Sequence, residues 1–336
     1  MDQPTGLPDH LTVPHGGAAA APGQTTLTFS AHPRSLDDNL YVYAVLSRRA
    51  RGISIGVNLN PDKVCNWDCI YCQVDRTTPP RVREVDLSVL RAELDQVLAA
   101  VASGALFTRP PFAGVPEAFR RVADISFSGD GEPTTYPRFK EAVEAVIAAK
   151  AAAGLPDLKV TVLTNATMFH RPAVREALAL LDRHQGEIWA KLDAGTEAYY
   201  RKVDATTIPF ARVLRNILEG ARVRPIVIQS LFMRVDGVGP DAAEVAAYCD
   251  RLRGLLREGG QIKLVQVYTV ARPPAQPNVS ALSDAEVDAI AAAVRAAVAV
   301  PVEAYYGTPL AAGVGRLGES AVSRRPPPGD VGGGTP

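Results

Sequence analysis

The chain has 336 residues, of which 47% are hydrophobic and 21% are charged, and its 36 basic and 36 acidic side chains cancel. An apolar share of this size is typical of folded globular proteins and excludes a wholly disordered or fibrous chain. The balanced charge argues against a strongly basic nucleic-acid binder, although it leaves room for a local basic patch.

Both ends of the chain are rich in small residues and proline. Residues 1–34 show no periodicity, and the segment 306–336 ends in RRPPPGDVGGGTP. We expect a flexible N-terminal tail, a core domain at 35–305 and a mostly disordered C-terminal extension. The N-terminus lacks the basic region of a signal peptide, and no apolar run is as long as a membrane span. We therefore expect a cytoplasmic protein without a membrane partner.

Between these ends, short apolar runs alternate with longer helical patterns. The first run, at 53–59, precedes a helical pattern at 87–102. The alternation of expected strand and helix continues through 123–128 and 138–153, 158–164 and 172–182, 187–193 and 210–222, 224–232 and 242–257, and 262–270 and 284–298. Pro172 stands where a helix begins, and Gly154 and Gly259 stand where helices end. This alternation predicts a parallel sheet with helical crossovers.

The number of strand–helix units narrows the fold class. Six units are too few for a closed eight-stranded barrel, so we expect an α/β fold built as a partial (β/α)6 barrel. A doubly wound sheet has the same local pattern and remains an alternative. In both architectures ligands gather at the C-terminal ends of the strands. The unusual residues of this chain follow its expected strands, which predicts a single site there.

Three of the four cysteines, Cys65, Cys69 and Cys72, lie within eight residues after the first expected strand. Three thiolates in one loop can bind three corners of a [4Fe–4S] cluster and leave one iron open. Zinc is an alternative, but a structural zinc site needs a fourth ligand and no histidine lies near the motif. A disulfide or unliganded thiols are also possible. Cys249 stands in an expected helix, and we expect it to be a buried structural thiol.

Polar motifs follow the next three expected strands. The second strand is followed by Ser128, Gly129, Asp130, Gly131 and Glu132. This segment is a turn signal by itself, but its glycines also permit close backbone approach to a ligand, and its carboxylate can pair with an ammonium group.

Asn165 ends the third expected strand, where it either contacts a ligand or stabilises its own turn. Lys191 and Asp193 end the fourth strand and share one face, because side chains alternate along a strand. They either pair with each other or bind charged groups of ligands.

The spacing C-x3-C-x2-C, with Tyr71 before the last cysteine, resembles the radical S-adenosylmethionine (SAM) superfamily. This resemblance implies a single [4Fe–4S] cluster held by Cys65, Cys69 and Cys72, whose open iron chelates SAM. It also implies reductive cleavage of SAM to a 5′-deoxyadenosyl radical that abstracts hydrogen from a substrate.

The other motifs extend this resemblance. The segment 128–132 is similar to the Gly-Gly-Glu motif of the superfamily, which receives the methionine ammonium of SAM, and it departs from that motif by placing Asp130 between the glycines. Thr164-Asn165-Ala166 resembles a further turn of the family. The resemblance therefore adds the following residues as candidate cofactor contacts: Tyr71, Ser128, Gly129, Asp130, Gly131, Glu132, Asn165, Lys191 and Asp193.

Residues 60–64, 127–133, 191–195 and 265–274 also resemble bacterial proteins grouped with the wyosine-type tRNA guanosine-modifying radical SAM enzymes. Archaeal wyosine-forming enzymes carry further cysteines for a second cluster, which this chain cannot build with Cys249 alone. A tRNA base is therefore one candidate substrate. The alternatives are an activase of a glycyl-radical enzyme and a non-catalytic zinc-binding scaffold.

The segment 47–83 carries seven basic and three acidic side chains. This local excess fits the phosphates of a tRNA or an acidic electron donor such as flavodoxin or ferredoxin. The alternative is that these side chains form ordinary surface ion pairs.

Overall fold

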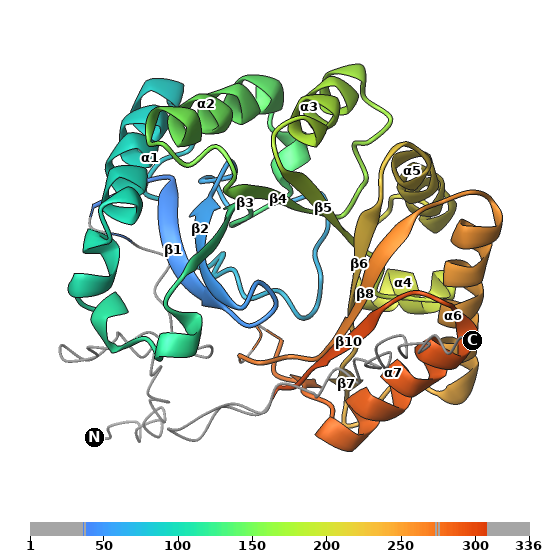
Figure 1. The fold of residues 1–336 in the computed structure, drawn as a ribbon. Coiled ribbons are helices and arrows are strands. Elements are labelled where there is room, and N and C mark those ends of the chain that lie inside the picture. Colours follow the sequence, from blue (N-terminus) through green and yellow to red (C-terminus); the bar gives the residue numbers. More distant parts are fainter. Residues whose placement is uncertain (1–35, 37, 273, 275, 308–336) are drawn as a thin grey trace, which may run out of the picture.

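The computed structural model describes residues 36, 38–272, 274 and 276–307. The expected tails, 1–34 and 306–336, lie outside these residues except for 306 and 307. Eight strands form one sheet that curves around an open centre (Figure 1). In sheet order they are β1 (Val42–Ser47), β2 (Gly52–Val57), β3 (Val122–Phe127), β4 (Lys159–Thr164), β5 (Gly186–Lys191), β6 (Ile226–Leu231), β8 (Ile262–Tyr268) and β10 (Val302–Tyr305).

Helices cover the outer face of this sheet (Figure 1). They are α1 (Leu87–Ala102), α2 (Phe139–Ala152), α3 (Pro172–Asp182), α5 (Phe210–Val223), α6 (Ala242–Arg257) and α7 (Asp284–Ala297). Within this sheet, β2, β3, β4, β5, β6, β8 and β10 pair in parallel in chain order, so each crossover returns on the same side. This order confirms the partial barrel and excludes the doubly wound alternative, which needs a reversal of strand order and helices on both faces.

Local signals explain where the helices begin and end. Asp86 caps α1 by accepting hydrogen bonds from the backbone of Ser88 and Val89, and α7 begins with a capping box formed by Ser283 and Glu286. Pro172 is the first residue of α3, as predicted. The apolar faces of these helices pack on the sheet, with α1 against β1, α3 against β5 and α7 against β8 and β10, and this packing contributes to the core.

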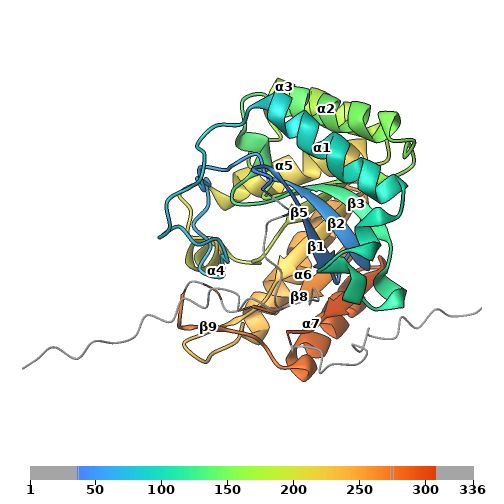
Figure 2. The same ribbon diagram turned by 90° about the vertical axis from the view of Figure 1, so that its left-hand side faces the viewer.

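Some elements were not predicted. Strand β1 pairs antiparallel with β2 and makes a hairpin, and β10 adds a short parallel strand beside β8. The remaining unpredicted elements are α4 (Glu197–Val203), a small ribbon of β7 (Arg234–Val235) and β9 (Val279–Ser280), and four 3-10 turns at Ala105–Thr108, Phe112–Gly114, Glu117–Phe119 and Pro133–Thr135. Figure 2 shows α4 at the same end of the barrel as the long loop between β2 and α1. Within the described part of the chain, no helix is long and apolar enough to cross a membrane.

Candidate functional site

A cavity of about 340 Å³ lies inside the curved sheet. Its wall includes the three clustered cysteines, contributed by the loop between β2 and α1. Polar side chains line the same cavity from most strands of the sheet, among them Ser54, Asp124, Ser126, Lys191 and Gln229. The interior of the barrel is therefore hydrophilic, whereas the opposite face of the sheet packs against the helices.

The cysteine loop is held against the end of α4. The backbone N–H of Ile70 donates to the carbonyl of Val203 at 3.0 Å, and the N–H of Asp68 donates to the carbonyl of Asp204 at 3.3 Å. Trp67 is buried and lies edge-on to Tyr200, with ring centroids 5.6 Å apart. These contacts anchor both the backbone and one side chain of the loop, and they fix the direction in which its cysteines point.

The three thiols have the properties of ligands for a metal cluster. Cys65, Cys69 and Cys72 are half-buried and form no disulfide. Burial raises the pKa of Cys65, and burial together with the nearby Asp204 raises the pKa of Cys69 well above its usual value. Such thiols become thiolates when metal ions supply compensating positive charge. Among the described residues, no three His, Cys, Asp or Glu side chains converge on the position of a single ion.

The glycines of the segment 128–132 allow it to lie against the cysteine loop. A Cβ atom on Gly131 would lie 2.3 Å from the carbonyl oxygen of Val64, and one on Gly129 would lie 2.5 Å from Oδ1 of Asn58. Gly129 also has a φ of 151°, which a side chain disfavours. Both glycines line the cavity, as does Ser128, whose hydroxyl is 2.9 Å from that of Tyr43.

Asp130 is directed elsewhere. Its Oδ2 accepts a 2.8 Å hydrogen bond from Nδ2 of Asn58, and its N–H donates to Oδ1 of the same asparagine at 3.2 Å. Asp130 is absent from the wall of the cavity as the described residues form it. Asp130, the acidic residue between the two glycines, is thus hydrogen-bonded to Asn58, which directly follows β2.

Glu132 is 3% exposed and joins two strand ends. Its Oε1 accepts hydrogen bonds from the hydroxyls of Thr134 and Thr164 and from the N–H of Thr134, while its Oε2 accepts from the N–H of Asn165. Burial raises the pKa of this carboxyl, and the four hydrogen bonds oppose that rise. Glu132 lines the cavity, but both of its oxygens already have partners.

Asn165 also makes local bonds. Its Oδ1 accepts from the N–H and hydroxyl of Thr167 at 3.1 and 2.6 Å, which stabilises the turn after β4. Its Nδ2 donates to Oδ1 of Asn66 at 2.7 Å and so ties this turn to the cysteine loop. Asn66, which the sequence analysis missed, carries no motif signal of its own.

Lys191 and Asp193 lie together at the end of β5, as their spacing predicts. Nζ of Lys191 is 3.1 Å from Oδ2 of Asp193 and donates to the hydroxyl of Tyr268 at 3.2 Å. Burial alone would lower the pKa of Lys191, but Asp193 raises it above its ordinary value. Lys191 also lies over the ring of Tyr71, 4.9 Å from its centroid.

The Tyr71 phenol is held by two carboxyl groups. It donates to Asp193 at 2.6 Å and lies 3.1 Å from Oδ1 of Asp204. Asp204 is fully buried, its Oδ1 lies 3.9 Å from Sγ of Cys69, and its Oδ2 has no partner among the described residues. Burial and the charge of Asp193 raise the pKa of Asp204 well above its usual value. Asp204 was not among the residues expected at the site, because no motif surrounds it in the sequence.

The basic residues of segment 47–83 do not form a single surface patch. Arg51 pairs with Glu303 at 3.3 Å, and Arg76 pairs with Asp68 at 2.9 Å. Nζ of Lys63 donates to the backbone carbonyls of Asp75 and Thr78. In addition, Arg48 and Arg49 line the cavity. Part of the local positive charge is therefore neutralised, and another part faces the interior of the barrel.

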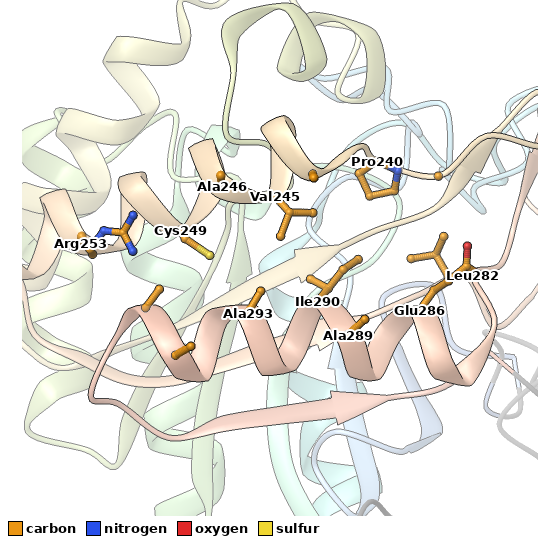
Figure 3. A pocket seen from close by; sticks show the side chains of 14 residues that line it. Pro240, Val245, Ala246, Cys249, Arg253, Leu282, Glu286, Ala289, Ile290 and Ala293 are labelled. Carbon is orange, nitrogen blue, oxygen red and sulfur yellow. The ribbon is translucent and has the colours of Figure 1, made fainter.

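A second cavity, of about 530 Å³, lies between α6 and α7 on the outside of the barrel (Figure 3). Its wall is mostly alanine and other apolar side chains, and it includes the buried Cys249. Burial raises the pKa of this thiol. Cys249 thus packs between two helices, away from the three clustered cysteines, in agreement with a structural thiol.

Comparison with known proteins identifies the family. Residues 59–233 match the family described as the radical SAM superfamily. The chain belongs to this superfamily. The matched span contains the cysteine loop, the segment 128–132, Asn165, Lys191 and Asp193. As a radical SAM protein the chain is an enzyme, which removes the non-catalytic scaffold from consideration. Membership also implies a [4Fe–4S] cluster and SAM as cofactors, and with them a source of electrons.

Curated relatives match about half of this chain at modest identity. A UPF0026 protein of Helicobacter pylori is 29% identical over 178 residues, which cover 52% of this chain and 48% of that protein. A UPF0026 protein of Methanocaldococcus jannaschii is 28% identical over 183 residues, which cover 52% of this chain and 46% of that protein. The match thus spans about half the length of these curated relatives.

Solved structures resemble this chain at low sequence identity. A radical SAM methyltransferase from Sphaerobacter thermophilus superposes with a TM-score of 0.55 at 15% identity, covering 81% of this chain and 71% of that one. An archaeal TYW1 has a TM-score of 0.42 at 12% identity, with 76% of this chain and 82% of that one covered. The methyltransferase supports the partial-barrel fold of this radical SAM protein.

Proposed function

We propose that Cys65, Cys69 and Cys72 hold one [4Fe–4S] cluster, and that the barrel cavity binds SAM next to it together with a substrate. The observation that carries this proposal is that the three unpaired thiols share one cavity wall with Gly129 and Gly131. When bound, the cluster supplies the electron that cleaves SAM to a 5′-deoxyadenosyl radical, which abstracts hydrogen from the substrate.

The surrounding residues have two kinds of role in this proposal. Ser128, Gly129, Gly131 and Glu132 offer a backbone and carboxylate surface to the SAM ammonium, with the glycines permitting close approach. Asp130, through Asn58, and Asn165, through Asn66, position this surface and the cysteine loop.

A connected group of side chains lies next to the cysteine loop, and it consists of Tyr71, Lys191 and Asp193. Lys191 offers an ammonium group to a ligand oxygen, while Asp193 orients both Lys191 and the Tyr71 phenol. Tyr71 and Lys191 line the cavity and can contact ligands, whereas Asp193 lies outside the wall and acts through these two side chains.

The first substrate to test is a tRNA base, because the motifs around residues 60–64, 127–133, 191–195 and 265–274 resemble the wyosine-type group. For the electron donor we propose an acidic protein such as flavodoxin or ferredoxin, which would meet the exposed cations near the cysteine loop.

The experiment is anaerobic reconstitution with iron and sulfide, followed by low-temperature EPR of the reduced protein with and without SAM. We expect a reduced [4Fe–4S] signal that changes when SAM is added, together with 5′-deoxyadenosine among the products. A chain that takes up no cluster, or a cluster signal that SAM leaves unaltered, would overturn the proposal. Incubation with unmodified tRNA, compared with no RNA, then tests the substrate by mass spectrometry of the nucleosides.

A further inference from the structure

The turn between β1 and β2 brings two adjacent arginines into the barrel cavity. The hairpin turn points toward β10 across the opening of the curved sheet (Figure 1). It is held there by Arg48, whose guanidinium donates to the carbonyl of Tyr306, and by the ion pair of Arg51 with Glu303. Because of this placement, both Arg48 and Arg49 line the cavity that also contains the cysteines.

Arg49 lies against two aromatic rings. Its guanidinium carbon is 4.5 Å from the ring centroid of Tyr268 and 5.9 Å from that of Trp189. These rings give the side chain a defined position, because a planar guanidinium is attracted to an aromatic face. The Arg49 side chain is half-buried and lines the cavity.

The charge of Arg49 is not matched within the described part of the chain. Its Nη1 is buried and has no hydrogen-bond partner there, and no described carboxylate lies within ion-pair distance. By contrast, Arg224, whose side chain is 13% exposed, pairs with Asp182 at 2.7 Å. The attraction of a guanidinium to an aromatic ring is weaker than the hydration that it loses when it is buried. The attraction to the two rings therefore compensates only part of the hydration that the guanidinium of Arg49 loses.

Arg48 increases the local positive charge. Burial and the charge of Arg49 lower the pKa of Arg48 to about 10. Two further cations, Lys191 and Arg272, line the cavity, and Lys191 already has Asp193 as its partner. Arg48 and Arg49 are thus neighbours at the cavity, and neither pairs with a carboxylate among the described residues. An anion bound between them would reduce their mutual repulsion.

We propose that Arg49, with Arg48 beside it, binds an oxyanion of the substrate, either a carboxylate or a phosphate, while Trp189 and Tyr268 flank the bound group. This rests on the proposed function, since it assigns the barrel cavity to the substrate. The planar fork of a guanidinium matches the two oxygens of either group. The substrate of this enzyme is therefore an acid or a phosphate ester rather than a neutral or cationic molecule.

The test is calorimetric titration of the full chain, without iron, using inorganic phosphate and acetate as separate probes. We expect one saturable site for at least one probe, with a Kd on the order of millimolar, and binding about tenfold weaker in Arg49→Gln. Preference for phosphate would indicate a phosphate ester, and preference for acetate a carboxylic acid. Arg91→Gln is the matched control, because Arg91 pairs with Asp95 on the exposed side of α1; it should bind both probes like the wild type.

Two further measurements make the result decisive. Arg49→Lys keeps the charge but loses the fork, so it should bind the preferred probe a few-fold more weakly, and it serves if Arg49→Gln does not fold. The proposal is overturned if the Arg49 variants bind the probes as tightly as the wild type does, or if the wild type binds neither probe. It is also overturned by a loss of SAM affinity in reconstituted Arg49→Gln as large as its loss of anion affinity, since Arg49 would then contact the SAM carboxylate. If the wild type forms no cluster, the proposed function fails, while the iron-free titration still decides whether Arg49 binds an anion.

Discussion

The phenol of Tyr71 donates a 2.6 Å hydrogen bond to Oδ2 of Asp193, which lies 122 residues further along the chain. The other oxygen of Asp193 accepts from the backbone N–H of Leu231, at the end of β6. One carboxylate therefore joins the loop that carries the three cysteines to two neighbouring strands. Asp193 thus holds Tyr71, the residue directly before Cys72, against the strand ends of the barrel.

We expect Tyr71→Phe to lower the free energy of unfolding of the iron-free protein by about 1.5–3 kcal/mol, because it removes a hydrogen bond to a buried carboxylate. The reconstituted variant should also retain less iron after desalting. Urea unfolding and iron analysis are the measurements. Tyr199→Phe is the control: the hydroxyl of Tyr199 is buried without a partner among the described residues, so its removal should cost nothing. Equal losses in both variants would contradict this account.

Replacing any one of Cys65, Cys69 or Cys72 with Ala should abolish cluster assembly and the formation of 5′-deoxyadenosine, because each proposed ligand holds a separate iron. Cys249→Ala should leave both intact, since this thiol packs between α6 and α7. Iron and sulfide per chain, measured after anaerobic reconstitution, test the assignment. Loss of the cluster in Cys249→Ala with retention in Cys72→Ala would mean that the ligands are wrongly assigned.

Gly131→Ala should displace the cysteine loop, because the added Cβ would lie 2.3 Å from the carbonyl oxygen of Val64. We expect a loss of stability of about 1–3 kcal/mol and weaker SAM binding after reconstitution. Gly254→Ala in α6 is the matched control: its nearest neighbour would be 4.0 Å away, and it should gain about 0.5–1 kcal/mol of helix stability. Thermal unfolding and SAM titration would measure both, and unchanged SAM binding in Gly131→Ala would refute the close packing.

Asp193 and Asp204 should differ in their sensitivity to replacement. Asp193→Asn leaves the buried Lys191 without its carboxylate and should cost about 3 kcal/mol. Asp204→Asn should cost much less, because burial raises the pKa of Asp204 and an amide resembles its protonated form. The stability of wild type relative to Asp204→Asn should fall as the pH rises through the elevated pKa of Asp204. Urea unfolding over a range of pH measures this, and a greater cost for Asp204→Asn would reverse the assignment.

The stability contributed by Glu187 should depend on pH in the opposite sense. Burial would raise the pKa of Glu187, but hydrogen bonds from Lys263, Trp189 and Lys159 lower it below its usual value. The contribution is therefore present above an unfolded pKa of about 4.3 and is lost as the pH falls through the lower folded pKa.

Accordingly, Glu187→Gln should be about 1–2 kcal/mol less stable than the wild type near neutral pH, and the difference should shrink below about pH 4. Glu176→Gln removes the exposed pair with Lys140 and should change stability by less than about 0.5 kcal/mol. Chemical unfolding across this pH range is the measurement, and a difference for Glu187→Gln that does not vary with pH would exclude the ionic explanation.

Much of the barrel follows from local sequence patterns. The expected strand at 262–270 and the expected helix at 172–182 agree with β8 and α3, because buried strands read as apolar runs and Pro172 suits the first turn of a helix. The cysteine spacing likewise identified the superfamily, since three ligands on one short loop are encoded within eight residues. Such signals are local in the chain and need no tertiary information.

The tertiary structure alone decided which distant side chains meet. Asp204 lies beside Tyr71 although 133 residues separate them, and Arg49 reaches Tyr268 through a hairpin that no motif marked. Asp130 bonds to Asn58 and does not line the cavity, and this contact forms only because β2 lies beside β3 in the sheet. Periodicity records which face of an element is buried, whereas the pairing of charges inside a barrel depends on sheet curvature and loop docking. For this reason the sequence determined the fold and the cluster motif, while the charge pattern of the cavity emerged only from the folded chain.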